Sequence, residues 1–366
     1  MNHWQDNWET TKKRLELLWQ NELLDRCCVK VTAPLGNTAE RYAAHKVKPQ
    51  PSDQQGLYEW YNDGEWLLAR SRAAIESTYF AGDAYPCVFP YFGTGGHAKY
   101  VAPESSVEYA PSTIWVHPCV DDLTSFDFSF DPDTNKVFRR ELEVIEYLVS
   151  ECRGDYLVGA TDNCGSYDAL AQLYGNERLL CDFIDDPEPV KAAAAKLVDI
   201  LKRSSERFFA ETKRGWQDGA AHGWMNTYSH GNHLQLQCDL SVMISPGIYD
   251  EFIRSELVTT ARFLEHAVYH FDGIEQIRHL DVLLSIPEIN MIQWTQVAGQ
   301  PPVTEFIPVL KRIQAAGKGL VLIVGKEQLK PLCESLSARG VIYITGASTP
   351  DEADAIVDYV KNTAKA

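Results

Sequence analysis

A histidine and an aspartate stand two residues apart in the segment Tyr269-His270-Phe271-Asp272-Gly273. The segment closes an apolar run, 267–271, that is typical of a β-strand, and residues two apart on a strand share a face. His270 and Asp272 could therefore bind a metal, act as a general acid–base couple or form a structural pair. A hydrogen-bonded core histidine is the plainer alternative for His270.

Further metal ligands would have to come from other segments, because one strand supplies only two and a zinc site needs three or four. His230, His233 and Asp239 are residues whose types suit that role. Asp239 precedes a predicted helix start at 245–246, so capping a loop is an equal alternative to binding substrate or metal. We predict a site for a divalent metal, zinc or another, on His270 and Asp272.

Asp162 closely follows the apolar run 156–160. Burial at such a place would raise its pKa and suit it to acid–base work. The alternative is a cap for the helix that contains 169–173, a role for which Ser166 and Asp168 compete. We predict catalytic roles for four residues: His270, Asp272, Asp162 and Asp239.

Eight short β-rich runs alternate with segments of helical periodicity, which predicts an α/β chain. Thr349 and Pro350 illustrate the helix starts, as an N-cap followed by proline in the first turn. No G-x-G-x-x-G or G-x-x-x-x-G-K-[ST] loop favours the alternative, an open doubly wound sheet. We predict a distorted (β/α)₈ TIM barrel forming one domain, 1–366, with an N-terminal helical extension at 1–25. The runs are 27–33, 86–92, 156–160, 220–225, 267–271, 290–294, 320–324 and 341–344.

A barrel of this kind collects its active site at the carboxyl ends of its strands. Aromatic, imidazole and amide side chains follow the predicted strands, and they suit a pocket for a partly flat or apolar small molecule. The tryptophans have a core position as their plainer alternative. The residues predicted to bind substrate are Tyr91, His97, Trp224, Tyr228, His230, His233, Gln293 and Trp294.

Composition excludes several other classes of protein. The 51 acidic and 34 basic residues give a net charge of −17, which disfavours nucleic acid and anionic membranes as partners. The nine cysteines form no C-x-x-C pair, so neither a redox motif nor a zinc ribbon is indicated. No signal peptide or membrane-spanning run is evident, and we predict a cytoplasmic protein.

Several segments resemble the uroporphyrinogen decarboxylase superfamily, which also contains cobalamin-dependent methyltransferases. YHFDG at 269–273 looks most like an uncharacterised branch that reads Tyr-His-Leu-Asp-Gly there. The resemblance implies a distorted (β/α)₈ barrel and transfer of methyl groups between small substrates, corrinoid proteins and thiols. The other matching stretches are DYLVGATDNCGSYDALAQLYG (155–175), FIDDPEPV (183–190), QCDLSVMISPGIYDEFI (237–253), INMIQW (289–294), GKGLVLIV (317–324) and ARGVIYITGASTPDEADAIVDYV (338–360).

The chain departs from this superfamily at its metal-binding positions. Zinc-dependent members carry His-x-Cys on strand five and a further Cys near the last strand. This chain has His270-Phe271-Asp272 and Thr345-Gly346 there. An oxygen-rich site would bind a different metal from the usual thiol-activating zinc, or none. The arginine-rich segment by which true uroporphyrinogen decarboxylases hold their polyanionic tetrapyrrole is also absent.

The resemblance makes a methyltransferase the first hypothesis, acting on a small methylated substrate. A corrinoid would belong to a partner protein, because this chain has no Asp-x-His-x-x-Gly cobalamin motif. One alternative is a decarboxylase or lyase acting on a small carboxylate or tetrapyrrole-like substrate, which would need Lys30 or Arg278 to point inward. Another is a non-catalytic ligand-binding barrel. The sequence leaves the substrate and the oligomeric state open.

Overall fold

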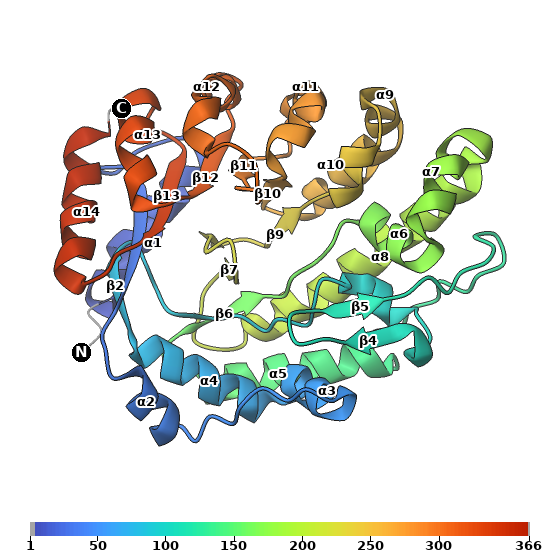
Figure 1. Ribbon diagram of the computed structural model, residues 1–366, viewed down its shortest axis with the longest axis horizontal. Coiled ribbons are helices and arrows are strands. Elements are labelled where there is room, and N and C mark those ends of the chain that lie inside the picture. Colours follow the sequence, from blue (N-terminus) through green and yellow to red (C-terminus); the bar gives the residue numbers. More distant parts are fainter. Residues whose placement is uncertain (1–3, 365–366) are drawn as a thin grey trace.

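The strands of the chain lie around a common centre, and most of its helices lie outside them (Figure 1). The computed structural model describes residues 4–364. The predicted extension at 1–25 and the predicted domain 1–366 therefore reach, at their ends, outside the described residues. The strands are β1 (Cys28–Pro34), β2 (Thr78–Gly82), β3 (Cys87–Val88), β4 (Val107–Tyr109), β5 (Ile114–Val116), β6 (Leu157–Ala160), β7 (Ala220–His222), β8 (Tyr228–Ser229), β9 (His233–Leu236), β10 (His266–Phe271), β11 (Met291–Trp294), β12 (Gly319–Ile323) and β13 (Val341–Gly346).

The strands form a seven-stranded sheet, a four-stranded sheet and a hairpin. The first has the order β2-β1-β13-β12-β11-β10-β9 and is parallel except for β2, and the second has the order β3-β6-β7-β8. Within residues 4–364 no ladder joins β2 to β3 or β8 to β9. The α/β class is thus confirmed, but a closed eight-stranded ladder is not, because antiparallel β2 and β8 occupy the sheet edges where it would have to close.

The helices agree with the predicted alternation. Thr349 caps the last of them, since its Oγ1 accepts a hydrogen bond from the backbone N–H of Glu352 at 3.2 Å. None of the helices within 4–364 combines the length and apolar character needed to cross a membrane. The helices are α1 (Trp8–Trp19), α2 (Thr38–Ala44), α3 (Gln54–Asn62), α4 (Gly64–Glu76), α5 (Lys136–Glu151), α6 (Ser166–Tyr174), α7 (Asn176–Asp185), α8 (Pro187–Thr212), α9 (Pro246–Ile248), α10 (Arg254–Phe263), α11 (Leu280–Leu284), α12 (Ile307–Ala315), α13 (Leu329–Ser335) and α14 (Pro350–Thr363).

Two of the predicted strands differ in the structure. The run 86–92 yields only the two residues of β3, because Pro86 and Pro90 flank it and proline has no N–H for a ladder. The run 220–225 stops after three residues at His222, where the chain turns into a β7–β8 hairpin. Strand β9, which the prediction lacked, then pairs in parallel with β10.

Helix α1 closes the amino-terminal end of the strand arrangement. Its Trp8 and Leu15 pack in one buried cluster with Cys28, Val268 and Met291, which stand near the starts of their strands. The Trp8 ring meets the rings of two buried tyrosines edge to face, with centroids 5.2 and 5.3 Å apart. The opposite end, where the parallel strands finish, is left for polar side chains.

Candidate functional site

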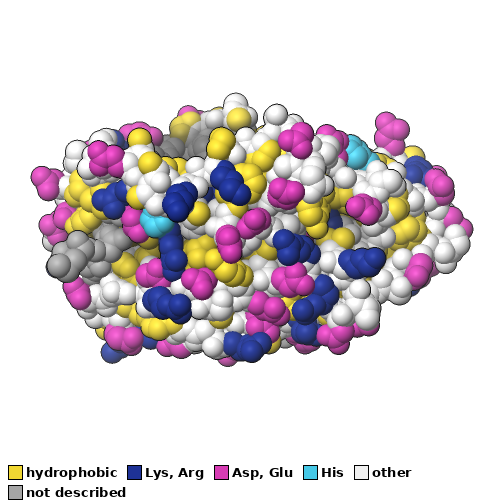
Figure 2. All heavy atoms as spheres, turned by 90° about the horizontal axis from the view of Figure 1, so that it is seen from below, with side chains coloured by type: hydrophobic (Ala, Val, Ile, Leu, Met, Phe, Trp, Pro, Cys, Tyr) yellow, Lys and Arg dark blue, Asp and Glu magenta, His cyan; other side chains and the backbone are white. Residues whose placement is uncertain are grey.

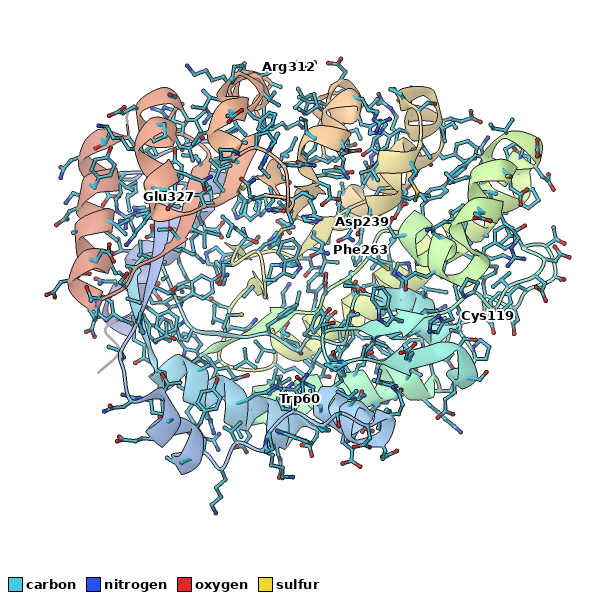
Figure 3. The ribbon with its side chains drawn as sticks, viewed as in Figure 1. Trp60, Cys119, Asp239, Phe263, Arg312 and Glu327 are labelled. Carbon is cyan, nitrogen blue, oxygen red and sulfur yellow. The ribbon has the colours of Figure 1, made fainter. Side chains whose placement is uncertain are left out.

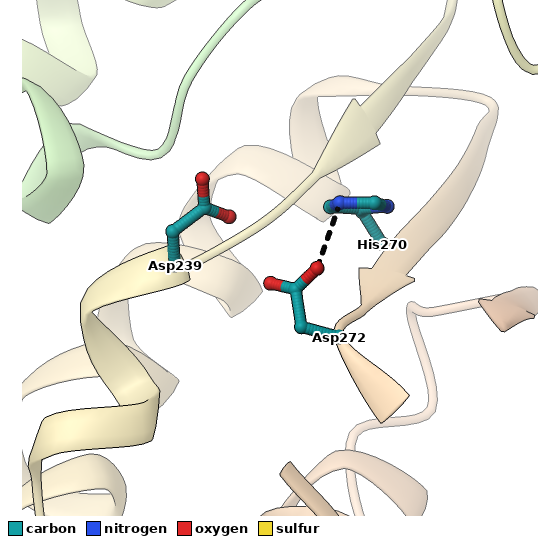
Figure 4. Close-up of side chains that lie close together, drawn as sticks. All are labelled: Asp239, His270 and Asp272. Atoms are coloured by element: carbon teal, nitrogen blue, oxygen red, sulfur yellow. Dashed lines mark ion pairs between the residues drawn. The ribbon is translucent and has the colours of Figure 1, made fainter. Parts of the chain in front are cut away.

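His270, Asp272 and Asp239 come together where the parallel strands β9 and β10 end. His270 is the second-last residue of β10, Asp272 directly follows that strand, and Asp239 opens the 3₁₀ helix η4 (Asp239–Met243) after β9. The Nε2 atom of His270 lies 3.1 Å from Oδ1 of Asp272 (Figure 4). One ligand atom from each of the three residues lies within 4.8 Å of the others. We call this group the His270 cluster.

Two neighbours fix the orientation of the His270 ring. Its Nδ1 lies 2.5 Å from Oε1 of Gln293 and 3.0 Å from Oγ1 of Thr295, and Gln293 is its register partner on β11. The amide of Gln293 is itself oriented, because its Nε2 donates to the carbonyl of Trp294 at 2.9 Å. An amide oxygen only accepts, so Nδ1 carries a proton and Nε2 faces the two carboxylates.

The cluster has an excess of negative charge. Burial lowers the pKa of His270, but the hydrogen bond and charge of Asp272 outweigh it and raise that pKa to about 9. Asp239 reaches solvent, yet the protein around it desolvates its carboxylate, and the charge of Asp272 adds to this, so its pKa rises to about 6. Two carboxylates and an imidazole arranged in this way favour a bound cation.

Asp162 and Trp224 adjoin the cluster on the face of His270. The Trp224 ring stands at 83° to the His270 ring with centroids 5.1 Å apart, and its Nε1 donates to Oδ1 of Asp162 at 3.2 Å. The same oxygen accepts from Nε2 of Gln235 at 2.7 Å. Burial raises the pKa of Asp162, and these two hydrogen bonds only partly oppose the rise. A proton donor or acceptor and an aromatic face therefore lie beside His270.

Buried polar residues hold the loop that carries Asp239. Asp168, in the first turn of α6, accepts the backbone N–H groups of Asp239 and Leu240 at 3.0 and 2.9 Å. The side-chain amide of Gln276 donates at 3.2 Å both to Oδ2 of Asp272 and to the carbonyl of Cys238. The position of both carboxylates thus depends on side chains from α6 and from the 3₁₀ helix that follows β10.

Glu256 on α10 supports the same region and gives a testable pH effect. Its carboxylate accepts the backbone N–H of Ser166, and its other oxygen has no partner within residues 4–364. Burial raises its pKa to about 7. The neutral form therefore contributes stability that is complete below the ordinary pKa of about 4.5 and is lost as the pH rises to about 7.

We expect Glu256→Gln to stabilise the protein at pH 8 by about 2–3 kcal/mol relative to the wild type and to have little effect at pH 4.5, since the amide keeps the acceptor and has no proton to lose. Denaturant unfolding at a series of pH values measures the difference. Glu206→Gln, at an exposed position on α8, is the control. A difference that does not change with pH would show that burial of the Glu256 charge carries no such cost.

Three residues expected at the site lie at the other end of the strands. Tyr228 donates to Asp218 at 2.6 Å and packs on Trp8, and the backbone N–H of His230 donates to Glu16 at 2.9 Å. His233 is buried, with Nε2 2.6 Å from the hydroxyl of Thr227. The expectation that they bind substrate at the carboxyl ends of the strands is corrected, because β8 runs antiparallel to β7 and returns the chain to the amino-terminal end beside α1.

Trp294 is also placed differently from the expectation. Successive strand residues point to opposite faces, so Gln293 on the inner face puts Trp294 on the outer face. There Trp294 is buried and stacks on Phe306 with centroids 5.0 Å apart. Its expected position in the pocket wall is therefore corrected to a core position, the plainer alternative that the sequence left open.

Tyr91 and His97 lie on the segment after β3. Tyr91 is half-buried, and its hydroxyl lies 3.1 Å from that of Thr113. His97 is fully buried in the 3₁₀ helix η2 (Gly96–Tyr100), and neither ring nitrogen has a hydrogen-bond partner within residues 4–364. Burial lowers the pKa of His97 to about 3, so the ring is neutral. Neither residue contacts the His270 cluster through a hydrogen bond.

Gln235, Asp168 and Gln276 belong to the site but were not among the predicted site residues. A signal for Gln235 exists in the segment His-Leu-Gln-Leu-Gln, 233–237, whose strict alternation is that of a strand with a polar inner face. For Asp168 the sequence indicates only a helix cap. Nothing in the spacing of Gln276 links it to Cys238, because that contact joins two separate loops.

The comparisons with known proteins bear on the fold. No family model matches the sequence, and no curated protein matches it. Among solved structures, a methyltransferase from Methanosarcina mazei is similar, with a TM-score of 0.64 and 14% sequence identity. The match covers 96% of this chain and 98% of that chain. The two proteins share a fold. The likeness therefore extends over almost the full length of both chains.

Proposed function

We propose that the chain is a metal-dependent methyltransferase that moves a methyl group from a small methylated substrate to a corrinoid protein or a thiol. The observation that carries the proposal is the His270 cluster, an imidazole with two carboxylates at the carboxyl ends of parallel strands. The fold shared with a methyltransferase supports it. We also infer membership of the uroporphyrinogen decarboxylase superfamily, with the two sheets as its distorted barrel interrupted at two places.

The side chains of the cluster fit a divalent metal. His270, Asp239 and Asp272 offer one nitrogen and two oxygen donors, and Gln293 holds His270 in the tautomer that a ligand needs. The donor set has no thiolate, so it suits zinc or a harder divalent ion. A bound metal would act as a Lewis acid on the heteroatom that carries the methyl group.

The remaining polar groups suit a neutral or cationic methyl donor. The face of Trp224 can hold a methylammonium or a methyl group beside His270. Asp162, whose pKa is raised by burial, can return a proton to the leaving heteroatom after the methyl group departs. No Lys or Arg is hydrogen-bonded to Asp162, Asp239 or Asp272 within residues 4–364, and a carboxylate substrate would meet repulsion there.

A decarboxylase or lyase is the second candidate, and the position of Lys30 favours it. Lys30 points inward from β1, with Nζ 3.5 Å from the centroid of the Tyr85 ring and a hydrogen bond to the carbonyl of Asn226. Burial lowers its pKa to about 7, and the charge of Asp83 opposes the shift. Arg278 instead donates to the carbonyl of Val242 at 3.0 Å on the exterior. Lys30 alone could therefore receive a small carboxylate.

A methyl-transfer assay separates these functions. The full chain is supplied with Zn²⁺, a panel of small O-, N- and S-methyl compounds, and either a reduced free corrinoid or a thiol. We expect methylated acceptor from at least one donor, loss of transfer in His270→Ala and retention in His230→Ala, which changes the same residue type at the far end. Release of CO₂ from small carboxylates, dependent on Lys30, would favour the lyase instead. Ligand binding with neither activity would favour a non-catalytic barrel.

Gln293 is expected to act on the metal through His270. Gln293→Leu keeps the volume and removes the acceptor of Nδ1–H, so we expect metal affinity to fall about 10–100-fold. Competition with a fluorescent chelator measures the affinity. Gln55→Leu, on an exposed face of α3, is the matched control and should leave it unchanged. Equal affinities in wild type and Gln293→Leu would mean that His270 is not a ligand or needs no orientation.

A further inference from the structure

A second concave region lies between α3, α4 and β3. A pocket of about 360 Å³ there adjoins another of about 580 Å³, and the two share Trp60 and Arg70. Trp60 is labelled in the lower part of the molecule in Figure 3. None of His270, Asp272 and Asp239 lines either pocket. The first pocket is lined by Trp60, Tyr61, Arg70, Phe89, Tyr91 and Ser112, among others.

Arg70 is a cation with no carboxylate oxygen of residues 4–364 within about 4 Å, and the charge of Asp63 acts on it only from farther away. Apart from Arg70 and Arg153, every arginine within residues 4–364 has a carboxylate oxygen within about 4 Å, and Arg153 is exposed at the surface. Arg70 is only partly exposed, and its one hydrogen bond runs from Nη1 to the carbonyl of Trp60 at 3.1 Å. A partly buried guanidinium with free donors is unfavourable unless an anion meets it.

The absence of a carboxylate close to Arg70 contrasts with the acidic character of the whole chain. The whole chain has 51 acidic residues against 34 basic ones, and acidic side chains are scattered over the face seen from below in Figure 2. Yet within residues 4–364 no Asp or Glu lines either pocket, whereas Arg70 and Lys48 both do. Lys48 also has no ion pair with any residue of 4–364, and its Nζ lies 5.0 Å from the centroid of the Trp66 ring. The two pockets are thus a local positive region on an acidic protein.

Four aromatic side chains, Trp60, Tyr61, Phe89 and Tyr91, line the first pocket beside Arg70. The guanidinium carbon of Arg70 lies 3.9 Å from the centroid of the Trp60 ring. The Tyr91 ring lies 5.6 Å from that of Phe89 and 6.1 Å from that of Tyr61, between centroids. A planar group can stack on such rings, and a guanidinium beside a tryptophan ring can present its remaining N–H donors to a carboxylate or phosphate.

We propose that this pocket binds a small molecule in which a planar ring carries an anionic group, a carboxylate or a phosphate, with Arg70 holding the anion. The aromatic side chains hold the ring, and Lys48 adds charge at the neighbouring opening. The proposal does not rest on methyl transfer, because its observable is binding.

Calorimetric titration of the full chain tests this. Benzoate and phenyl phosphate are the anionic probes, which distinguish carboxylate from phosphate, and benzyl alcohol and benzylamine are the neutral and cationic counterparts. We expect at least one anionic probe to bind about tenfold or more tightly than both counterparts, and Arg70→Met to weaken it by about tenfold or more. Arg178→Met is the matched control, since Arg178 similarly lies 4.5 Å over the Tyr174 ring but outside both pockets.

Several outcomes would overturn the proposal. Equal binding of benzyl alcohol would show that the anionic group is not recognised, and equal binding of inorganic phosphate alone would show that the ring is not recognised. If neither anionic probe binds, the proposed binding site is refuted. Unchanged affinity in Arg70→Met would show that Arg70 does not hold the anion. Thermal unfolding verifies that each variant is folded. If Arg70→Met is not, Lys48→Gln takes its place, with an expected loss of about threefold.

Discussion

Replacing His270 by alanine is expected to remove metal from the protein. Purified wild type, dialysed against Zn²⁺, Mn²⁺ or Co²⁺ and then against buffer, should retain about one equivalent of the preferred ion by elemental analysis. His270 contributes the one nitrogen donor of the cluster and is the side chain that Gln293 orients. Two carboxylates without it form a weak site, so the variant should retain close to none.

His230→Ala serves as the control for this experiment. His230 is exposed at the far end of the strands near Glu16, so its loss should leave the metal content unchanged. Asp272→Asn should resemble His270→Ala, because it removes the carboxylate 3.1 Å from Nε2. Wild type without any retained ion, or His270→Ala with full metal content, would refute the metal site and leave His270 and Asp162 as acid–base residues.

Replacing Asp83 by alanine is expected to cost about 3–5 kcal/mol of unfolding free energy. Asp83 is fully buried after β2, where it accepts from Arg14 and, at 2.6 Å, from Nη1 of Arg26. Its Oδ2 also accepts the backbone N–H of Val29 at 2.9 Å. Alanine would remove the Asp83 carboxylate from the buried guanidinium groups of Arg14 and Arg26 and leave the backbone N–H of Val29 without its acceptor. Arg14 belongs to α1, so the contact between α1 and the sheet would be weakened.

Denaturant unfolding monitored by tryptophan fluorescence measures this loss, and Asp354→Ala provides the matched control. Asp354 is an exposed aspartate on α14 that accepts a hydrogen bond from Tyr79 at 3.0 Å, so its replacement should cost no more than about 0.5 kcal/mol. A similar small change for Asp83→Ala would mean that Arg14 is satisfied by Asp25 alone, with which it makes hydrogen bonds of 2.8 and 2.9 Å.

The candidate site was predictable where the chemistry is local in sequence. His270 and Asp272 share a strand end, so period-two geometry was enough to pair them. Asp162 follows a strand that the structure confirms as β6. Asp239 joins them because β9 pairs in parallel with β10, a pairing between segments about thirty residues apart. The alternation of polar and apolar residues in β9 is visible in the sequence. The prediction of a single strand at 220–225 left β9 out.

The sequence misplaced the site residues whose position depends on the direction in which the chain runs after a strand. Tyr228, His230 and His233 follow a strand whose start at Ala220 was predicted but whose end was not, because the hairpin β7–β8 reverses the chain and sends them to the opposite end. No residue type in 223–227 marks that reversal unambiguously. Trp294 and Gln293 are neighbours in sequence, and only the packing of Trp294 on Phe306 against the outer helices decides which of them faces inward.

The sequence by itself determined the α/β class, the positions of most strands and helices, and the His270–Asp272 pair. These follow from periodicity, capping and turn residues, which act over a few residues. The tertiary structure alone decided that the strand ladder is interrupted, that Asp239 completes the cluster and that Arg70 has no carboxylate of the described residues within ion-pair distance. Those outcomes depend on which distant segments pack together, because an ion pair, a ligand set or a sheet edge is a relation between parts of the chain that local spacing does not encode.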